Sequence, residues 1–244
     1  MIAISTLLSK NPKYSLVIPA YNEAERISGI LSELDDEDLE YIFVCDGTDS
    51  TSEIITSHFQ GQEHHIQCLI FSERKGKGGG IIAGFNATHT PFIGFIDADQ
   101  SVSLKTIKKL FEDLEQALES NPDIGAFIGS RYVKDSNIEK PQPISRRIMS
   151  RCFNMATRVL FGLSYHDTQC GAKVCTKKAF DSISQDLTST GFEFDVELIW
   201  RLEQAGYKVH EIGIEWTDTE GSHLSFSTPL NMFWGLIKLK WNAL

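Results

Sequence analysis

The sequence predicts an α/β fold, in which one domain is built on a doubly wound, mainly parallel sheet with a helical extension at the C-terminus. Three observations support this fold class. Apolar runs that are rich in β-forming residues alternate with helix-like segments over the first half of the chain. Polar clusters follow the ends of these runs. The chain of 244 residues, 41% of them hydrophobic and 23% charged, suits one large core.

The first half contains five expected strands, which are short runs of mostly apolar residues: 14–19, 41–45, 66–71, 92–96 and 124–129. The helix-like segments between them are 22–34, 49–59, 78–88 and 103–118. Alternating strands and helices form parallel βαβ units, whose ligands bind beyond the carboxyl ends of the strands. We therefore expect one edge of the sheet to gather the polar residues that follow the strands: Tyr21–Glu23, Asp46, Lys75–Lys77, Asp97 with Asp99, and Ser130–Arg131.

The alternation stops after Arg131. Residues 140–166 hold five basic residues and no acidic one, interspersed with apolar side chains. This composition suits a helix that lies on an anionic surface or grips a phosphate, and equally a surface helix that faces the acidic body of the protein. Residues 207–216 resemble a strand.

The end of the chain predicts a helix, with Ser227 or Thr228 as N-cap and Pro229 at the first helical position. This helix is apolar nearly all round, so packing on the body, on a partner subunit or at a bilayer interface all fit. We expect residues 1–222 to form the main domain and residues 223–244 to form the C-terminal helix.

Bulk composition restricts the partners and the compartment. The 23 basic and 33 acidic residues give a formal net charge of −10, which argues against nucleic-acid binding. Five cysteines without a C-x-x-C pair indicate reduced thiols in a cytosolic protein. The first ten residues do not resemble a secretory signal, and no window reaches the roughly 20 apolar residues of a spanning helix. We expect a cytoplasmic protein, for which contact with the cytoplasmic face of a membrane stays open.

Asp97 and Asp99 stand one residue apart where the fourth expected strand ends. Two carboxylates that close repel each other unless a cation lies between them, and Mg²⁺ or Mn²⁺ prefers carboxylate together with substrate phosphate oxygens. Gln100 and Ser101 could complete the metal shell or merely turn the chain. The alternative for an isolated D-x-D pattern is a solvated acidic turn.

The other clusters carry weaker signals. Asp46 could accept a hydrogen bond from a base or ribose, although Asp46-Gly47 is also a common turn pair. The glycine-rich stretch ERKGKGGG could approach a phosphate, yet Gly78 stands where a P-loop needs Ser or Thr. Arg131 could give a diphosphate a bidentate contact, or form a salt bridge.

Taken in order, five motifs resemble the inverting family 2 glycosyltransferases with the GT-A fold: VIPAYNEAERI, VCDGTDST, RKGKGGGIIAGF, FIDADQS and GSRY. The second half is similar to dolichyl-phosphate β-glucosyltransferases and polyprenyl-phosphate mannose synthases, through DTQCGAKVCTKKAF, GFEFDVELIWRLEQAGYKVHEI and EWTDTEGSHL. The resemblance runs from residue 14 to the end of the chain, and the D-T-Q-C-G block is its most specific part.

The resemblance implies a role for each matching position. The nucleoside of a nucleotide-sugar donor would be held by Pro19, Tyr21, Glu23 and Asp46, with Lys77 near the base, the ribose or the phosphates. Asp97 and Asp99, with Ser101 as a further candidate ligand, would hold Mg²⁺ or Mn²⁺ and the donor diphosphate. Arg131 and one of Arg146 or Arg147 would take phosphate charge. Asp167 and Gln169 would lie by the sugar or the acceptor phosphate.

Three features depart from the family pattern. Cys45-Asp46 replaces the usual double aspartate after the second strand, which bears on base recognition. The mannose synthases often have a glutamine two residues after the D-x-D, whereas here Gln100 comes one residue after it and Ser101 takes the second place, which bears on metal coordination. Relatives of both kinds commonly carry transmembrane helices, whereas this sequence predicts none, so we expect a lipid acceptor to be met at the bilayer surface.

The expected function is transfer of a hexose, with inversion, from UDP-glucose or, less favoured, GDP-mannose to a polyprenyl or dolichyl phosphate. A membrane-protein partner or a homodimer would be compatible with it. One alternative is a glycosyltransferase with a soluble hydroxyl acceptor, which would need a base such as Asp167 or Glu193. Another is a non-catalytic subunit that binds nucleotide sugar. An aspartyl-nucleophile phosphatase fits less well, because its D-x-D motif usually lies on the first strand.

Overall fold

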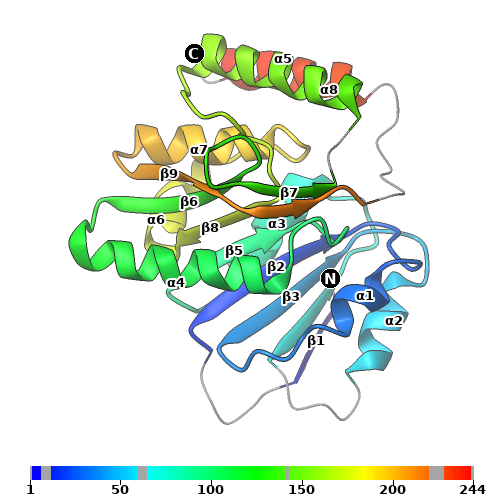
Figure 1. Ribbon diagram of the computed structural model, residues 1–244. Coiled ribbons are helices and arrows are strands. Elements are labelled where there is room, and N and C mark those ends of the chain that lie inside the picture. Colours follow the sequence, from blue (N-terminus) through cyan, green and yellow to red (C-terminus); the bar gives the residue numbers. More distant parts are fainter. Residues whose placement is uncertain (1, 7–11, 60–64, 141–142, 220–227, 243–244) are drawn as a thin grey trace.

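The computed structural model describes residues 2–6, 12–59, 65–140, 143–219 and 228–242, and its centre is a twisted sheet with helices on both faces (Figure 1). Within these residues the sheet has eight strands in the order β1–β4–β3–β2–β5–β8–β6–β9. The five strands that the sequence predicts are all present: β2 (Tyr14–Ala20), β3 (Leu39–Cys45), β4 (Ile66–Ile70), β5 (Phe92–Ile96) and β6 (Ile124–Ser130). β2 pairs in parallel with both β3 and β5, as expected of βαβ units.

Two strands of the sheet were not expected from the sequence. β8 (Ala172–Thr176) is inserted between β5 and β6 and runs antiparallel to both. β1 (Ile2–Thr6) pairs antiparallel with β4 at the edge. β8 escapes pattern reading because its five residues include Lys173, although this lysine is only 1% exposed. A buried charge in so short a run hides the apolar signal of a strand.

The helices of the first half are α1 (Ile27–Leu31), α2 (Thr51–His58), α3 (Gly76–Ala87) and α4 (Leu104–Ser120). The expected helix 22–34 is much shorter than predicted. Asn22 adopts a positive φ of 55°, and Arg26 and Ile27 donate their backbone N–H groups to the carbonyl of Glu23 in a turn. α4 begins as expected, because the hydroxyl of Ser103 accepts the backbone N–H of Thr106.

The second half adds α5 (Ile144–Phe161), α6 (Lys177–Ile183), a short 3₁₀ turn (Ser184–Asp186), α7 (Phe194–Gln204) and α8 (Thr228–Asn242). The expected strand 207–216 is divided in two. β9 (Lys208–Gly213) joins the main sheet beside β6, whereas β10 (Glu215–Thr217) pairs with β7 (Asn137–Lys140) in a separate two-stranded sheet. The predicted C-terminal helix is present as α8, while Ser227 and the proposed boundary at 222/223 lie outside the described residues.

The core has three parts. α1, α2 and α4 cover one face of the sheet, and α3, α6 and α7 cover the other (Figure 1). A third cluster lies beneath α5 and α8, where Phe153 and Leu236 pack with Val196 and Ile199 of α7. Phe153 meets Phe233 edge to face at 5.6 Å, so that α5 and α8 form a layer of their own next to α7. No helix in the described part of the chain combines the length and apolarity that crossing a membrane requires.

Candidate active site

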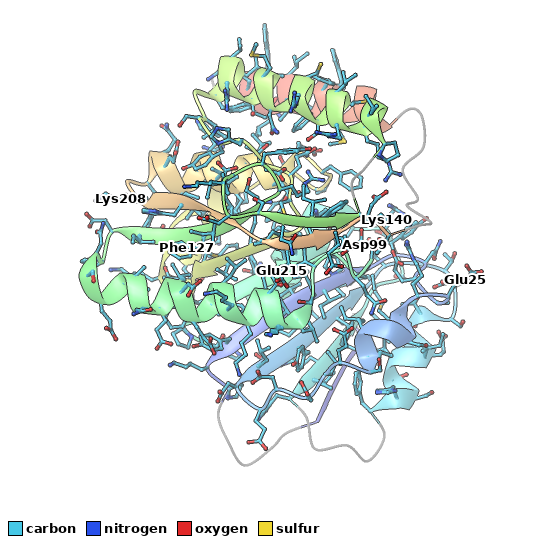
Figure 2. All side chains as sticks on the ribbon, in the orientation of Figure 1. Glu25, Asp99, Phe127, Lys140, Lys208 and Glu215 are labelled. Carbon is cyan, nitrogen blue, oxygen red and sulfur yellow. The ribbon has the colours of Figure 1, made fainter. Side chains whose placement is uncertain are left out.

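The carboxyl ends of β2, β3 and β5 open into two clefts that share a wall. The shared wall is formed by Lys77, Asp97, Asp99 and Phe192. We call the first the β2–β3 cleft; it is further lined by Pro19, Tyr21, Glu23, Asp46 and Arg74. The second, the α5–α8 cleft, is further lined by Ser101, Arg131, Arg146, Gln169, Met149, Phe153, Met232 and Phe233. The predicted convergence on one edge of the sheet is therefore present, with Asp99 at this edge (Figure 2).

The β2–β3 cleft has an aromatic and basic rim over a rigid base. The guanidinium of Arg74 stacks 3.2 Å from the ring centroid of Tyr21. Asp46 lies at the base, where its Oδ2 accepts the backbone N–H groups of Lys75 at 2.7 Å and Gly76 at 2.9 Å. Gly76 has a φ of +71°, a conformation that glycine adopts at little cost. Asp46 thus fixes the glycine-rich loop at the start of α3.

Lys77 connects Asp97, one of the two predicted metal-binding carboxylates, to a buried charge network. Its Nζ lies 2.9 Å from Asp97 Oδ1 and 3.1 Å from Asp195 Oδ2. Asp195 is fully buried, and its Oδ1 accepts from Lys173 Nζ at 2.5 Å. Burial alone would raise the pKa of Asp195, but Lys173 and Lys77 outweigh it and hold the pKa below its ordinary value. Asp195 is therefore an ionised anchor for Lys77.

The carboxylates of Asp97 and Asp99 are suitable but incomplete ligands for Mg²⁺ or Mn²⁺. Burial raises the pKa of Asp97 even though Lys77 opposes it, and Asp99 adds to the rise, so a further cation here would relieve an unfavourable concentration of charge. Asp99 Oδ1 accepts the backbone N–H of Ser101 at 2.9 Å. Among the described residues there is no cluster of three His, Cys, Asp or Glu side chains suited to a metal. The donor set fits an ion that takes its remaining ligands from phosphate and water.

Asp97 is held in place by the D-T-Q-C-G block. Its backbone N–H donates to the carbonyl of Gly171 at 3.1 Å. A Cβ built on Gly171 would overlap Asp97 Oδ2 and lie 2.5 Å from its Cγ. Any side chain at position 171 would therefore collide with the Asp97 carboxylate in its present position, and glycine leaves room for it.

The Gly171→Ala variant tests this contact. We expect the added methyl group to displace the Asp97 carboxylate and lower kcat/KM about 100-fold, because a displacement of ~1 Å at a reacting centre has effects of that size. Thermal unfolding, followed by circular dichroism, should show a folded protein. Full activity in the variant would contradict the proposed contact.

In the α5–α8 cleft, Arg131 is oriented by Asp167. Asp167 is fully buried and accepts Arg131 Nε at 2.7 Å, Nη2 at 2.9 Å and the backbone N–H at 3.0 Å. Gln169 donates to the carbonyl of Phe192 at 3.2 Å. Of the two candidate arginines on α5, Arg146 lines the cleft, 3.5 Å from Asp218, whereas Arg147 is exposed and lines neither cleft.

The structure therefore brings together all the predicted site residues except Arg147 and Asp167, the latter lying directly behind Arg131. Sequence reasoning missed Lys173, Asp195 and the cradle at Gly171. The motifs DTQCGAKV and GFEFDVEL, in which these residues lie, were the available signal. All five cysteines are free thiols, as expected.

Comparison with known proteins agrees with this geometry. The family model "Glycosyl transferase family 2" matches residues 15–184. The dolichyl-phosphate beta-glucosyltransferase of Dictyostelium discoideum is 28% identical over 259 residues, covering 98% of this chain and 79% of that protein. The one from Saccharomyces cerevisiae is 29% identical over 234 residues, covering 87% and 69%.

Solved structures share the fold. Glucosyl-3-phosphoglycerate synthase from Mycobacterium tuberculosis, in complex with Mn²⁺, UDP and glucosyl-3-phosphoglycerate, superposes with a TM-score of 0.68 at 17% identity, covering 94% of this chain and 80% of that one. The mannosyltransferase PcManGT from Pyrobaculum calidifontis, in complex with GDP-Man and Mn²⁺, gives a TM-score of 0.59 at 14% identity, covering 88% and 59%. The sheet is that of a GT-A fold, and the chain belongs to glycosyl transferase family 2.

Proposed function

We propose that the protein transfers a hexose, with inversion, from a nucleotide diphosphate sugar to a polyprenyl or dolichyl phosphate. The observation that carries this proposal is the lining of the α5–α8 cleft. Arg131 and Arg146, with Lys77, bring cations for a phosphate beside four aspartates, and an apolar wall for a hydrocarbon chain is formed by Met149, Phe153, Met232 and Phe233. The relatives named above, whose names specify dolichyl phosphate and glucose, support the same acceptor and favour UDP-glucose as donor.

The donor would lie in the β2–β3 cleft with its diphosphate at the shared wall. Its nucleoside would contact Tyr21, Glu23 and Asp46, and Lys77 would meet the phosphates. Asp97 and Asp99, with Ser101 nearby, would hold Mg²⁺ or Mn²⁺, which when bound supplies charge stabilisation for the departing diphosphate. The sugar would then project towards Gln169 and Arg131 at the junction of the two clefts.

The chemistry needs no general base. A phosphate monoester is already ionised near neutral pH, so its oxygen attacks the anomeric carbon directly as the bond to the diphosphate breaks. One carbon–oxygen bond forms, one breaks, and nucleoside diphosphate leaves. Lys77, Arg131 and Arg146 would position the two phosphates and stabilise their charge.

The soluble-acceptor alternative requires a base, and the cleft offers a poor one. Asp167 is fully buried with both oxygens bonded to Arg131. Glu193 Oε1 accepts the backbone N–H of Gly191 at 3.1 Å. Asp195 lines the cleft. Burial alone would raise its pKa, but Lys173 and Lys77 outweigh burial and hold the pKa below its ordinary value, so this carboxylate is a weak base. A hydroxyl acceptor is therefore less well served than a phosphate.

Transfer of radiolabel into an organic-extractable polyprenyl phosphate tests the proposal. Labelled UDP-glucose and GDP-mannose are compared, each with Mn²⁺, with Mg²⁺ and with chelator, and the unphosphorylated polyprenol serves as the matched control acceptor. We expect extractable label from UDP-glucose, dependent on metal and on the acceptor phosphate. Donor binding without transfer to any polyprenyl phosphate would instead indicate a soluble acceptor or a non-catalytic subunit.

A further inference from the structure

α5 and α8 lie side by side in a layer at one end of the molecule (Figure 1), and several large apolar side chains on the outward side of this layer are exposed. We call this side the outer face; its exposed apolar residues are Ile144, Ile148, Met155 and Val159 on α5, and Trp234, Ile237 and Trp241 on α8. Trp241 and Val159 are each 77% exposed and Trp234 is 68% exposed. Large apolar side chains that gather on one exposed face of a protein mark an interaction site.

Their spacing shows that these residues form stripes rather than scattered exceptions. On α5 the apolar positions recur at intervals of four, seven and four residues, which places them along one side of the helix. On α8 the intervals are three and four. The opposite sides of both helices are already buried, through Phe153 and Phe161 on α5 and Leu236 and Leu239 on α8. Each helix thus carries a second apolar surface that folding of the chain does not cover.

The charge of this layer differs from that of the whole protein. α5 and α8 contain six basic residues and no acidic one: Arg146, Arg147, Arg151, Arg158, Lys238 and Lys240. All 33 acidic residues of a chain with a net charge of −10 lie elsewhere. An apolar face flanked by cations, on an otherwise acidic protein, is complementary to anionic lipid. It is poorly suited to a second copy of the same face, because the like charges would repel.

The outer face is continuous with the α5–α8 cleft. Met149 lines the cleft and is also 40% exposed, next to Ile148 on the outer face. Inside the cleft the apolar wall continues through Phe153 and Phe233, and Arg131 and Arg146 line the same cleft. Met149 therefore brings the cleft to the edge of the outer face, where a lipid-linked acceptor would enter.

We infer that the outer face docks on an anionic lipid bilayer, with Trp234 and Trp241 at the interface, so that the α5–α8 cleft opens at the lipid surface. The assignment of the cleft to a lipid-linked acceptor rests on the proposed function. Docking itself rests on the apolar stripes and the basic flanks alone, and it is therefore measured without donor or acceptor.

Cys152 provides a reporter on the outer face. It is exposed on α5, whereas Cys45, Cys68, Cys170 and Cys175 are buried, and burial raises the pKa of Cys170 and of Cys175 to about 12. A polarity-sensitive maleimide dye should therefore react with one thiol of the native protein. Ser57 is exposed on α2, at the other end of the molecule (Figure 1), so Ser57→Cys in a Cys152→Ser background is the matched control.

The labelled proteins are mixed with vesicles of phosphatidylcholine, with and without phosphatidylglycerol. We expect the emission at Cys152 to shift to the blue with the anionic vesicles and to return when salt is raised, whereas the dye on α2 does not respond. An equal response from both dyes, or none from Cys152, would overturn the inference. Self-association of the protein through this face without vesicles, seen by sedimentation, would also overturn it.

Vesicle co-sedimentation of two double variants, each with two reversed charges, measures the electrostatic contribution to docking. Arg151→Glu with Lys238→Glu changes two exposed cations of the helix pair, and Lys105→Glu with Lys178→Glu changes two exposed cations on α4 and α6 by the same net charge. We expect the first pair to weaken partitioning into anionic vesicles by about tenfold or more, and the second by about twofold at most. Equal losses would overturn the inference.

A transfer assay with detergent-solubilised polyprenyl phosphate separates the two proposals. Failure of the wild-type protein to dock on anionic vesicles, together with transfer in detergent, would reject the outer face and leave the proposed function intact. Docking without any transfer would support the outer face and reject the proposed function.

Discussion

Asp97→Asn and Asp99→Asn are each expected to lower the rate of hexose transfer by about a thousandfold or more, because each variant removes a carboxylate from the site that we propose for the divalent cation and the diphosphate. The loss should be in chemistry and metal-dependent donor binding rather than in folding. In Asp97→Asn, Lys77 still pairs with Asp195 at 3.1 Å, so its buried ammonium keeps a counterion. Asn is close in shape to Asp, so packing at Gly171 is preserved.

The measurement is transfer rate together with Mn²⁺-dependent binding of donor by calorimetry. Asp123→Asn, which neutralises an aspartate whose side chain is 67% exposed, is the matched control and should behave as the wild type. Wild-type rates in both Asp97→Asn and Asp99→Asn would show that these carboxylates do not hold a catalytic cation.

Asp167→Asn is expected to destabilise the fold by about 3–5 kcal/mol, because it leaves the buried guanidinium of Arg131 without its counter-charge. The side chain of Arg131 is 10% exposed and that of Asp167 is 0% exposed. Burial alone would lower the pKa of Arg131, and in the wild type the pairing with Asp167 raises it. A guanidinium is not deprotonated in proteins even without such a partner, so the variant keeps a buried cation. Water or a movement of the chain would have to compensate the positive charge of the Arg131 guanidinium.

Urea unfolding of the variant, compared with Asp113→Asn, measures this effect. Asp113 pairs with Lys109 on α4, where the lysine side chain is 72% exposed, and loss of such a surface pair costs less than about 1 kcal/mol. Arg131→Lys should retain the positive charge but lose the bidentate hydrogen bonding to Asp167. We expect a smaller loss of stability than in Asp167→Asn and a raised KM for the acceptor phosphate. Equal stability of Asp167→Asn and the wild type would contradict the description of this pair.

The parallel half of the sheet was predictable from the sequence because its strands are buried on both faces and therefore form runs of mostly apolar residues. The position of the site followed from the same argument, since Asp46 and Asp97 both stand directly after such runs. In this half of the sheet the local sequence pattern agrees with the topology, so the pattern alone is enough to predict the strands.

What escaped prediction depends on partners far apart in the chain. Lys173 looks like a surface lysine in sequence, and its burial makes sense only once Asp195 lies 2.5 Å away, 22 residues later. The short α1 has a similar cause. The side-chain oxygen of Asn22 accepts the backbone N–H of Thr48 at 2.8 Å, so Asn22 does not cap a helix that begins at residue 22. Pairings between residues so far apart produce no periodic pattern in the local sequence, so they cannot be predicted from it.

The antiparallel insertion of β8 has a consequence for how the chain acquires its native state. β5 and β6 are neighbours in the sequence but not in the sheet, because β8, made of residues 172–176, must lie between them. Until those residues emerge from the ribosome, β5 has an open edge and Asp97 lacks Gly171 beneath it. Contacts between segments so distant along the chain form slowly and leave the growing protein exposed to aggregation. Chaperone binding after residue 131 has emerged would protect this edge until β8 arrives, whereas a pause in translation there would prolong its exposure.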